Sequence, residues 1–251
     1  MEEENNMTLT EHLGDLRRVL TVSIIAIFVT SIASYAAFGD QLFGLVTEPL
    51  KKFDVELIYI GMAEAFVTKI KVAILAGIIL ALPVILWQIW SFVAPALLPK
   101  ERRYFILLIP ISALLFAGGA LFAYLVVFNF AARFLLVVVS GDLTPMLSVG
   151  KYVSFLIAFV LPFGAVFELP LVVYFLTKIG LINHRWLARN RKFALLGFFI
   201  IAAVLTPPDV VSQILLAGPM LVLYEIGVII ARFVKPRETM DETEVEVRQD
   251  S

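Results

Sequence analysis

The stretch VAILAGIILALPVILWQIWSFV, residues 72–93, contains no charged residue. The hydrocarbon core of a bilayer is about 30 Å thick, and a helix needs roughly 20 apolar residues to cross it. Backbone amides and carbonyls meet no water there, so a spanning segment satisfies its own hydrogen bonds as a helix. Residues 72–93 therefore predict a transmembrane helix.

Five more apolar stretches extend this pattern along the chain. The predicted spans are residues 19–38, 72–93, 105–128, 152–176, 193–205 and 207–231. The 251 residues are 61% hydrophobic and 16% charged, which leaves little chain for a soluble domain. We therefore predict an all-α integral membrane protein with six transmembrane helices in a single domain, residues 8–235.

The polar ends of the chain are predicted to differ from this domain. Residues 1–7 and 236–251 have the composition of disordered segments. Between residues 1–7 and the first span, Thr8 and Glu11 have the spacing of a capping box, and leucines recur on one helix face. Residues 8–18 therefore predict an interfacial helix.

Prolines lie within several of the predicted spans, at Pro83, Pro110, Pro162 and Pro170. A proline inside a helix removes one backbone hydrogen bond and favours a kink. Several kinked helices in one small bundle predict a curved, concave body.

The last two spans are predicted to be short. Residues 193–205 would make a helix of about 20 Å, and Thr206-Pro207-Pro208-Asp209 resembles a helix start with Thr206 as the N-cap. We expect a tight hairpin that stops short of the far headgroups and thins the bilayer locally. A re-entrant hairpin is the alternative, although basic residues at both ends favour crossing.

The first loop after residue 38 is predicted to be structured. Asp40 is placed to cap a short helix that Pro49 ends, with Leu42, Phe43 and Val46 as its apolar stripe. Residues 55–60 are predicted to be extended.

Basic residues are distributed unevenly between the spans. With the N-terminus inside, 14 of the 20 lysines and arginines fall on the cytoplasmic side. Cytoplasmic loops of membrane proteins carry such an excess, so we predict that both termini are cytoplasmic.

Glu168 is the acid that stands out, because it lies inside the fourth predicted span. An intramembrane carboxyl group is costly and indicates function by default. A protonated side chain bonded to a neighbouring helix is the structural alternative. For Gln213 and Glu225, interhelical hydrogen bonding is at least as good an interpretation as ligand contact.

Acids also lie at the predicted cytoplasmic face. Glu11 and Asp15 are four residues apart, so their like charges repel weakly, which suits a visiting cation; neutralisation by Arg18 and headgroups is the alternative. Glu101 lies among Lys100, Arg102 and Arg103, where the helix dipole alone explains an acid.

Known catalytic sets are missing from the sequence. It has no cysteine, two histidines 172 positions apart, and no phosphate loop. We expect no enzyme activity, no metal or organic cofactor and no nucleic-acid partner.

A set of motifs occurs in order along the chain: EHLGDLR at 11–17, PVILWQ at 83–88, FVAPAL at 92–97, ERR at 101–103, FELP at 167–170, LTPPDV at 205–210 and YEIG at 224–227. Together they resemble the TatC family, the receptor subunit of the twin-arginine (Sec-independent) protein translocase. One such motif is weak evidence, but the ordered set covers roughly residues 8–235 and is highly specific.

The resemblance implies six kinked spans in a glove-like bundle within a bacterial-type cytoplasmic (inner) membrane. It implies a receptor that binds twin-arginine signal peptides at the cytoplasmic face and nucleates assembly. The implied partners are precursor proteins, single-span TatA/TatB-type subunits, further copies of the receptor and the lipid bilayer. Export of folded proteins would be driven by the proton motive force.

The resemblance also assigns residues. Asp15 and Glu101 match acids implicated in holding the signal arginines, Glu168 matches the intramembrane acid, and Thr206 and Gln213 match polar positions for partner-helix docking. The family usually has Glu where this chain has Asp15. An adjusted helix position, or a share taken by Glu11, would compensate for the shorter side chain.

Two rival functions come from the residues alone. One is a small proton-coupled secondary transporter with Glu168 as proton carrier, although the two halves show no internal repeat. The other is a membrane enzyme, which the missing catalytic residues argue against.

Overall fold

The structure is a computed structural model, and it describes residues 9–51, 55, 57–93, 105–139, 146–206 and 209–234. The predicted disordered ends, residues 1–7 and 236–251, lie outside this part of the chain. The elements are α1 Leu9–Lys51, β1 Leu57–Ile58, α2 Glu64–Val93, α3 Phe105–Phe122, η3 Ala123–Val127, α4 Phe128–Arg133, η4 Phe134–Val139, β2 Leu147–Ser148, α5 Val149–Phe167, α6 Leu169–Lys178, α7 His184–Arg189, α8 Arg191–Leu205 and α9 Val210–Phe233.

Five helical segments in the described residues are long and apolar enough to cross a membrane. They are Leu13–Leu50, Glu64–Phe92, Leu107–Val138, Val149–Lys178 and Val210–Phe233. The all-α membrane class is therefore confirmed. With 15 residues, α8 is shorter than these segments, so its crossing of the bilayer stays a prediction.

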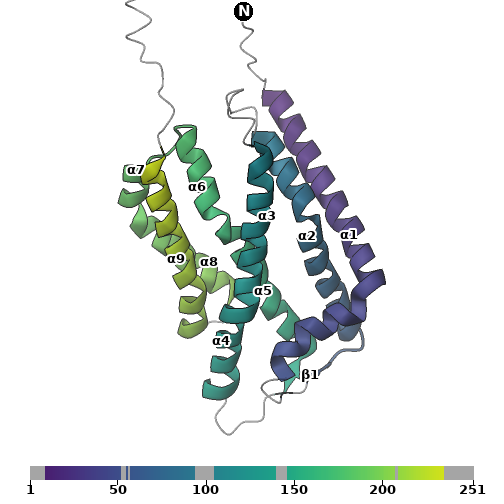
Figure 1. The fold of residues 1–251 in the computed structure, drawn as a ribbon. Coiled ribbons are helices and arrows are strands. Elements are labelled where there is room, and N and C mark those ends of the chain that lie inside the picture. Colours follow the sequence, from purple (N-terminus) through teal and green to yellow (C-terminus); the bar gives the residue numbers. More distant parts are fainter. Residues whose placement is uncertain are drawn as a thin grey trace, which may run out of the picture.

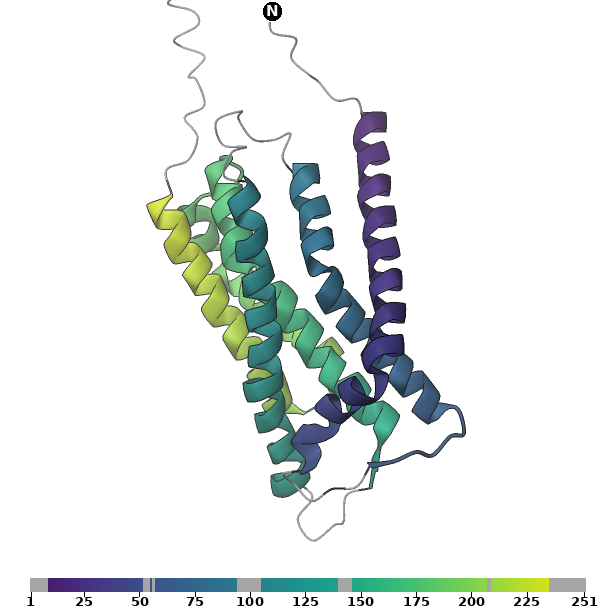
Figure 2. The ribbon, with the colours of Figure 1, turned by 45° about the vertical axis from the view of Figure 1, so that its right-hand side comes forward.

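The first helix is longer than the sequence predicted. From Leu9 on, no break separates the predicted interfacial helix from the first span, and no separate helix begins at Asp40, because α1 continues from Leu9 to Lys51. Both predicted boundaries are wrong. The physical reason is that no proline lies between Leu9 and Glu48, so the backbone hydrogen bonds can continue. Only the part of α1 nearest β1 turns away from its long axis (Figures 1 and 2).

The third span also exceeds its prediction, because helical structure continues past residue 128 to Val139. Two π-helical segments, η3 and η4, interrupt the α-helical pattern there. Tyr124 in η3 donates its hydroxyl to the Leu45 carbonyl of α1 at 2.7 Å. This bond places the third span against the last part of α1.

The fourth span is two helices rather than one kinked helix. α5 ends at Phe167 and α6 starts at Leu169, with Glu168 between them and Pro170 in the first turn of α6. Proline has no N–H to donate and its ring crowds the preceding turn, so the hydrogen-bond ladder is interrupted at this point. This break positions the intramembrane acid.

The hairpin between α8 and α9 is capped differently from the prediction. Asp209 is the N-cap of α9, and its Oδ1 accepts from the Ser212 N–H at 2.7 Å. Thr206 is the C-cap of α8, with its hydroxyl donating to the Ala202 carbonyl at 2.8 Å. The prediction of Thr206 as N-cap is therefore wrong, because the carboxylate at Asp209 supplies the cap.

Small residues allow the spans to approach closely. A Cβ on Gly119 of α3 would lie 2.6 Å from the Phe163 carbonyl oxygen of α5, and one on Gly77 of α2 would lie 2.7 Å from the Ser31 Cα of α1. Without a hydrophobic driving force in lipid, membrane helices associate through such contacts. Around them, the α5 rings Phe159 and Phe163 are fully buried.

The spans are arranged with α3 and α5 between the α1–α2 pair and the α6–α9 group (Figure 2). The start of α1 and the end of α9 lie at the same end of the molecule, and α8 and α9 meet short of the level that α4 reaches (Figure 1). At the opposite end, β1 and β2 pair in parallel, with Leu57 opposite Leu147. The predicted extended piece at 55–60 thus contains β1.

Candidate functional site

Asp15 lies in α1 at the end of the molecule where the helix begins. Its side chain is half-buried and makes no ion pair or hydrogen bond with any side chain that the structure describes. Leu13 and Leu16 beside it are 64% and 39% exposed. The side chain of Glu11 and all of Glu101 lie outside the described residues. Asp15 is thus the one acid of the predicted cytoplasmic face whose side chain is described, and its carboxylate has no side-chain partner within the described residues.

Glu168 lies at the α5–α6 break with its side chain half-buried. Its Oε1 is buried and has no hydrogen-bond partner among the described residues. The Ser112 hydroxyl of α3 interacts with the same carboxyl group. An acid inside the membrane region with one oxygen unbonded can accept a hydrogen bond from an incoming group or carry a proton.

Ser112 and Trp90 support Glu168, and the sequence analysis missed both. The Trp90 Nε1–H of α2 donates to the Ser112 Oγ at 3.1 Å, and both residues are buried. The Trp90 ring also meets Phe175 of α6 edge to face, with centroids 5.4 Å apart. A buried tryptophan needs a hydrogen-bond partner for its N–H. A tryptophan inside an apolar span was therefore the sequence feature that could have indicated a polar partner such as Ser112.

Thr206 and Gln213 already have partners within the α8–α9 hairpin. Thr206 is buried and bonded to the carbonyl of Ala202, and the Gln213 Nε2 donates to the Phe199 carbonyl at 3.1 Å. The interpretation of Gln213 as an interhelical hydrogen bond is confirmed. The outward side of α8 is apolar, with Ile200 and Val204 55% and 78% exposed.

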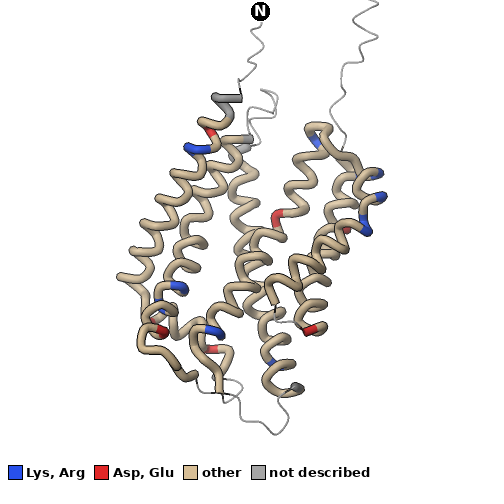
Figure 3. Tube along the Cα trace, turned by 180° about the vertical axis from the view of Figure 1, so that it is seen from behind, with Lys and Arg blue, Asp and Glu red and all other residues tan. Residues whose placement is uncertain are grey.

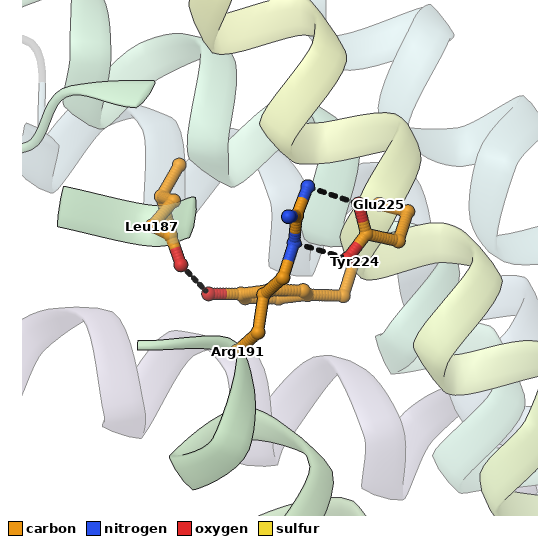
Figure 4. A network of polar contacts seen from close by, with 4 residues as sticks. All are labelled: Leu187, Arg191, Tyr224 and Glu225. Atoms are coloured by element: carbon orange, nitrogen blue, oxygen red, sulfur yellow. Dashed lines mark hydrogen bonds and ion pairs between the residues drawn. The ribbon is translucent and has the colours of Figure 1, made fainter. Parts of the chain in front are cut away.

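Glu225 also makes an interhelical contact, as predicted, and its partner is Arg191 at the start of α8. The Arg191 Nε lies 2.7 Å from Oε1 of Glu225, and Nη2 lies 2.8 Å from Oε2 (Figure 4). Next to this pair, the Tyr224 hydroxyl donates to the Leu187 carbonyl of α7 at 2.9 Å. These bonds hold α7, α8 and α9 together.

Charges are confined to the ends of the molecule in most spans, and basic residues gather where α7 and α8 meet (Figure 3). Within the described ranges, no group of three His, Cys, Asp or Glu residues could hold a metal ion. The fold and the site therefore define a multi-span helical membrane protein with an open carboxyl group in its interior.

Comparisons with known proteins identify the family. The model of the Sec-independent protein translocase protein (TatC) family matches residues 11–219. The chain is 50% identical to TatC of Carboxydothermus hydrogenoformans over 237 residues, which cover 94% of this chain and 97% of that protein. It is 44% identical to TatC of Aquifex aeolicus over 231 residues, which cover 90% and 95% of the two chains.

The fold agrees with this assignment. A crystal structure of the twin-arginine translocase receptor TatC superposes with a TM-score of 0.82 at 42% identity, covering 88% of this chain and 98% of that one. The chain belongs to the TatC family, and it is a component of the Sec-independent protein translocase. The predicted family and transport role are thereby confirmed, whereas the secondary transporter receives no support from these comparisons.

Proposed function

We propose that the chain binds twin-arginine signal peptides at the end of the molecule where α1 begins and α9 ends, and that this end is cytoplasmic. The observation that carries the proposal is the Asp15 carboxylate, which is half-buried and unpaired among the described side chains. A structurally similar protein is described as a twin-arginine translocase receptor. Basic residues at the start of α8 lie at the same end, as expected for a cytoplasmic face.

The chemistry of the site follows from the signal's two guanidinium groups. Each planar guanidinium binds a carboxylate best through two parallel hydrogen bonds, so adjacent arginines need separate acids. Asp15 supplies one carboxylate, and Glu101 supplies the other. Glu11, one helical turn before Asp15, shares the binding and offsets the short reach of the aspartate.

The apolar segment of the signal follows the arginines into the membrane region. Glu168 then serves as a hydrogen-bond acceptor for the signal or for a partner helix, since its Oε1 has no partner among the described residues. The second role open to Glu168 is that of a proton acceptor. Glutamine keeps the acceptor oxygen and loses the titration, so Glu168→Gln separates the two roles.

Single-span TatA/TatB-type subunits dock at the α8–α9 hairpin in this proposal. The exposed apolar side of α8 supplies most of the contact. The side-chain oxygen of Gln213 makes no hydrogen bond with the described residues, so it can accept one from the partner helix. Thr206 shapes the end of α8 through its own bond to Ala202. With further copies of the chain, this assembly exports folded precursors at the expense of the proton motive force.

The test is photo-crosslinking of a twin-arginine signal peptide to the full chain in membranes. Asp15→Lys should reduce crosslinking by about tenfold or more, because a charged hydrogen-bonded pair is replaced by repulsion. Glu48→Lys reverses an exposed acid at the opposite end of α1 and serves as the matched control. Undiminished crosslinking in Asp15→Lys, or equal binding of a peptide with both arginines replaced by glutamine, would refute the proposed site.

A further inference from the structure

A groove of about 530 Å³ runs along the outer surface between α1 and α2. On α1 it extends from Ile24 to Tyr35, and on α2 Phe66, Ile70 and Ile74 line it. Eleven helical rises of 1.5 Å make it about 16 Å long. Half of a 30 Å hydrocarbon core is about 15 Å, so the groove is as long as one leaflet is deep.

A polar cavity of about 340 Å³ lies next to one end of the groove, and Tyr35 lines both. The polar cavity contains Asp40, Gln41 and Lys69. The Lys69 Nζ lies 2.7 Å from the Asp40 Oδ1, with side chains 37% and 91% exposed. An ion pair this exposed contributes little by itself, so each charge is free to bind a ligand instead.

We propose that the groove and the polar cavity together bind one phospholipid with a phosphoethanolamine headgroup. One acyl chain lies in the groove, the headgroup phosphate accepts hydrogen bonds from Lys69, and the ligand's ammonium group donates to Asp40. The neighbouring positive and negative charges match the two charges of a zwitterionic headgroup. A headgroup with only negative charge would be repelled by the Asp40 carboxylate.

The lining of the groove favours an acyl chain over a partner helix. Helices that pack closely in membranes meet through small residues, whereas Ile24, Phe28, Ile32 and Phe66 keep large side chains here, each more than half exposed. Lipid tails are as apolar as leucine, so the groove itself gives no selectivity among phospholipids. Selectivity must come from the headgroup at Asp40 and Lys69.

A lipid in this position would brace the most exposed span. α1 packs mainly against α2, and outward-facing side chains such as Ile25 and Val29 stay more than half exposed along it. A bound acyl chain would contact both α1 and α2 over the depth of one leaflet. This is the leaflet nearest the ion pair between Asp40 of α1 and Lys69 of α2.

The experiment is lipid titration of the detergent-solubilised full chain, followed by native mass spectrometry. The probes are palmitoyl-oleoyl phosphatidylethanolamine, phosphatidylcholine and phosphatidylglycerol. We expect phosphatidylethanolamine to bind tightest, and Lys69→Gln to weaken it by about tenfold, because a charged hydrogen bond is lost. Lys71→Gln is the matched control, since Lys71 lies two residues away and donates to Ser154 at 2.9 Å.

Two further variants test the two halves of the site separately. Asp40→Ala should abolish the preference for phosphatidylethanolamine over phosphatidylcholine. The phosphatidylethanolamine ammonium loses its acceptor in this variant, whereas the trimethylated ammonium of phosphatidylcholine donates no hydrogen bond in either protein. Ile74→Trp should fill the groove and weaken all three lipids, while Leu80→Trp, on an exposed part of α2 outside the groove, should not.

Equal phosphatidylethanolamine binding by Lys69→Gln and Lys71→Gln would overturn the proposal. So would a photo-crosslinker placed at Ile70 in native membranes that captures a polypeptide instead of phospholipid. A phospholipid adduct lost in Ile74→Trp and kept in Leu80→Trp would support it.

Discussion

Glu64 and Glu168 are both acids at the end of a helix, but their surroundings differ. Glu64 begins α2, where its Oε1 accepts from the Ser148 hydroxyl and from the Gly150 N–H at 2.8 Å, and its Oε2 accepts from the Ile60 N–H at 2.7 Å. Glu168 has the interaction with Ser112, and its Oε1 is unbonded within the described chain. Both oxygens of Glu64 therefore accept hydrogen bonds from the protein itself. Glu168 still has an oxygen that can accept a hydrogen bond from a bound peptide or a partner helix.

The number of hydrogen bonds that a carboxyl group makes within the protein distinguishes structural acids from functional ones better than sequence position does. A fully bonded carboxylate specifies one arrangement of the backbone, because every lost bond leaves a donor unsatisfied. A half-bonded carboxyl group inside a membrane protein is a cost to stability that persists where function requires it. Variants of the two acids should therefore affect different measurements.

The largest effect is expected for Glu168→Ala, which should lower transport of a twin-arginine precursor by about tenfold or more through loss of a hydrogen bond to a charged group. The thermal midpoint in detergent should stay equal or rise, since a poorly satisfied buried acid is removed. Glu168→Gln keeps an acceptor oxygen and should retain most of the transport. Loss of transport in Glu168→Gln as well would assign a proton-carrying role instead.

Glu64→Gln should give the opposite result. Its amide nitrogen would face the N–H groups of either Ile60 and Gly61 or Gly150, so donors would meet donors at the end that β1 and β2 close. We expect a thermal midpoint several degrees lower and unchanged transport per folded molecule. Glu48→Gln, an exposed acid at the same end, is the control. A transport defect in correctly folded Glu64→Gln would contradict the structural role.

The serine partners of the two acids, Ser112 and Ser148, allow the same comparison to be tested without changing the acids themselves. Ser112→Ala removes the acceptor for Trp90 and a partner of Glu168, so it should cost about 1–2 kcal/mol of stability and reduce transport. Ser148→Ala removes a partner of Glu64 and should lower the thermal midpoint alone. Identical transport by the two serine variants would show that Ser112 does not position Glu168.

The smallest effect is expected for the exposed pair of Arg191 and Glu225. Its side chains are 54% and 45% exposed, so solvent screens the interaction to about 0.5 kcal/mol. Arg191→Lys loses the two-point contact and should lower the thermal midpoint only slightly, with less effect still in high salt. A large loss of stability in this variant would mean that the contact is screened less than its exposure implies.

The membrane class was predictable because the bilayer leaves few alternatives. Uncharged runs near 20 residues must be helices, and the structure has them at every predicted position except the short α8, whose crossing stays a prediction. Helix ends were predicted poorly, because a run such as Leu9–Lys51 continues through positions that looked like boundaries. Hydropathy indicates where lipid lies, and it does not indicate where a helix stops.

The candidate site was predictable in part. Glu168 was identified because a charge inside an apolar run is conspicuous, and Asp15 through a resemblance. The roles of Ser112 and Glu64 could not be read from the sequence, since their partners are distant. Glu64, for example, meets Ser148 from 84 positions away. Polar contacts between distant segments leave no local pattern.

The contact between Glu64 and the start of α5 also has a meaning for biogenesis. A chain is made from its N-terminus, so Glu64 enters the membrane long before Ser148 and Gly150 are synthesised. The hydrogen bonds between them can form only after the third span has crossed the membrane and the loop that follows it has reached the side on which Glu64 lies. They therefore form only when the first three spans cross the membrane in alternating directions.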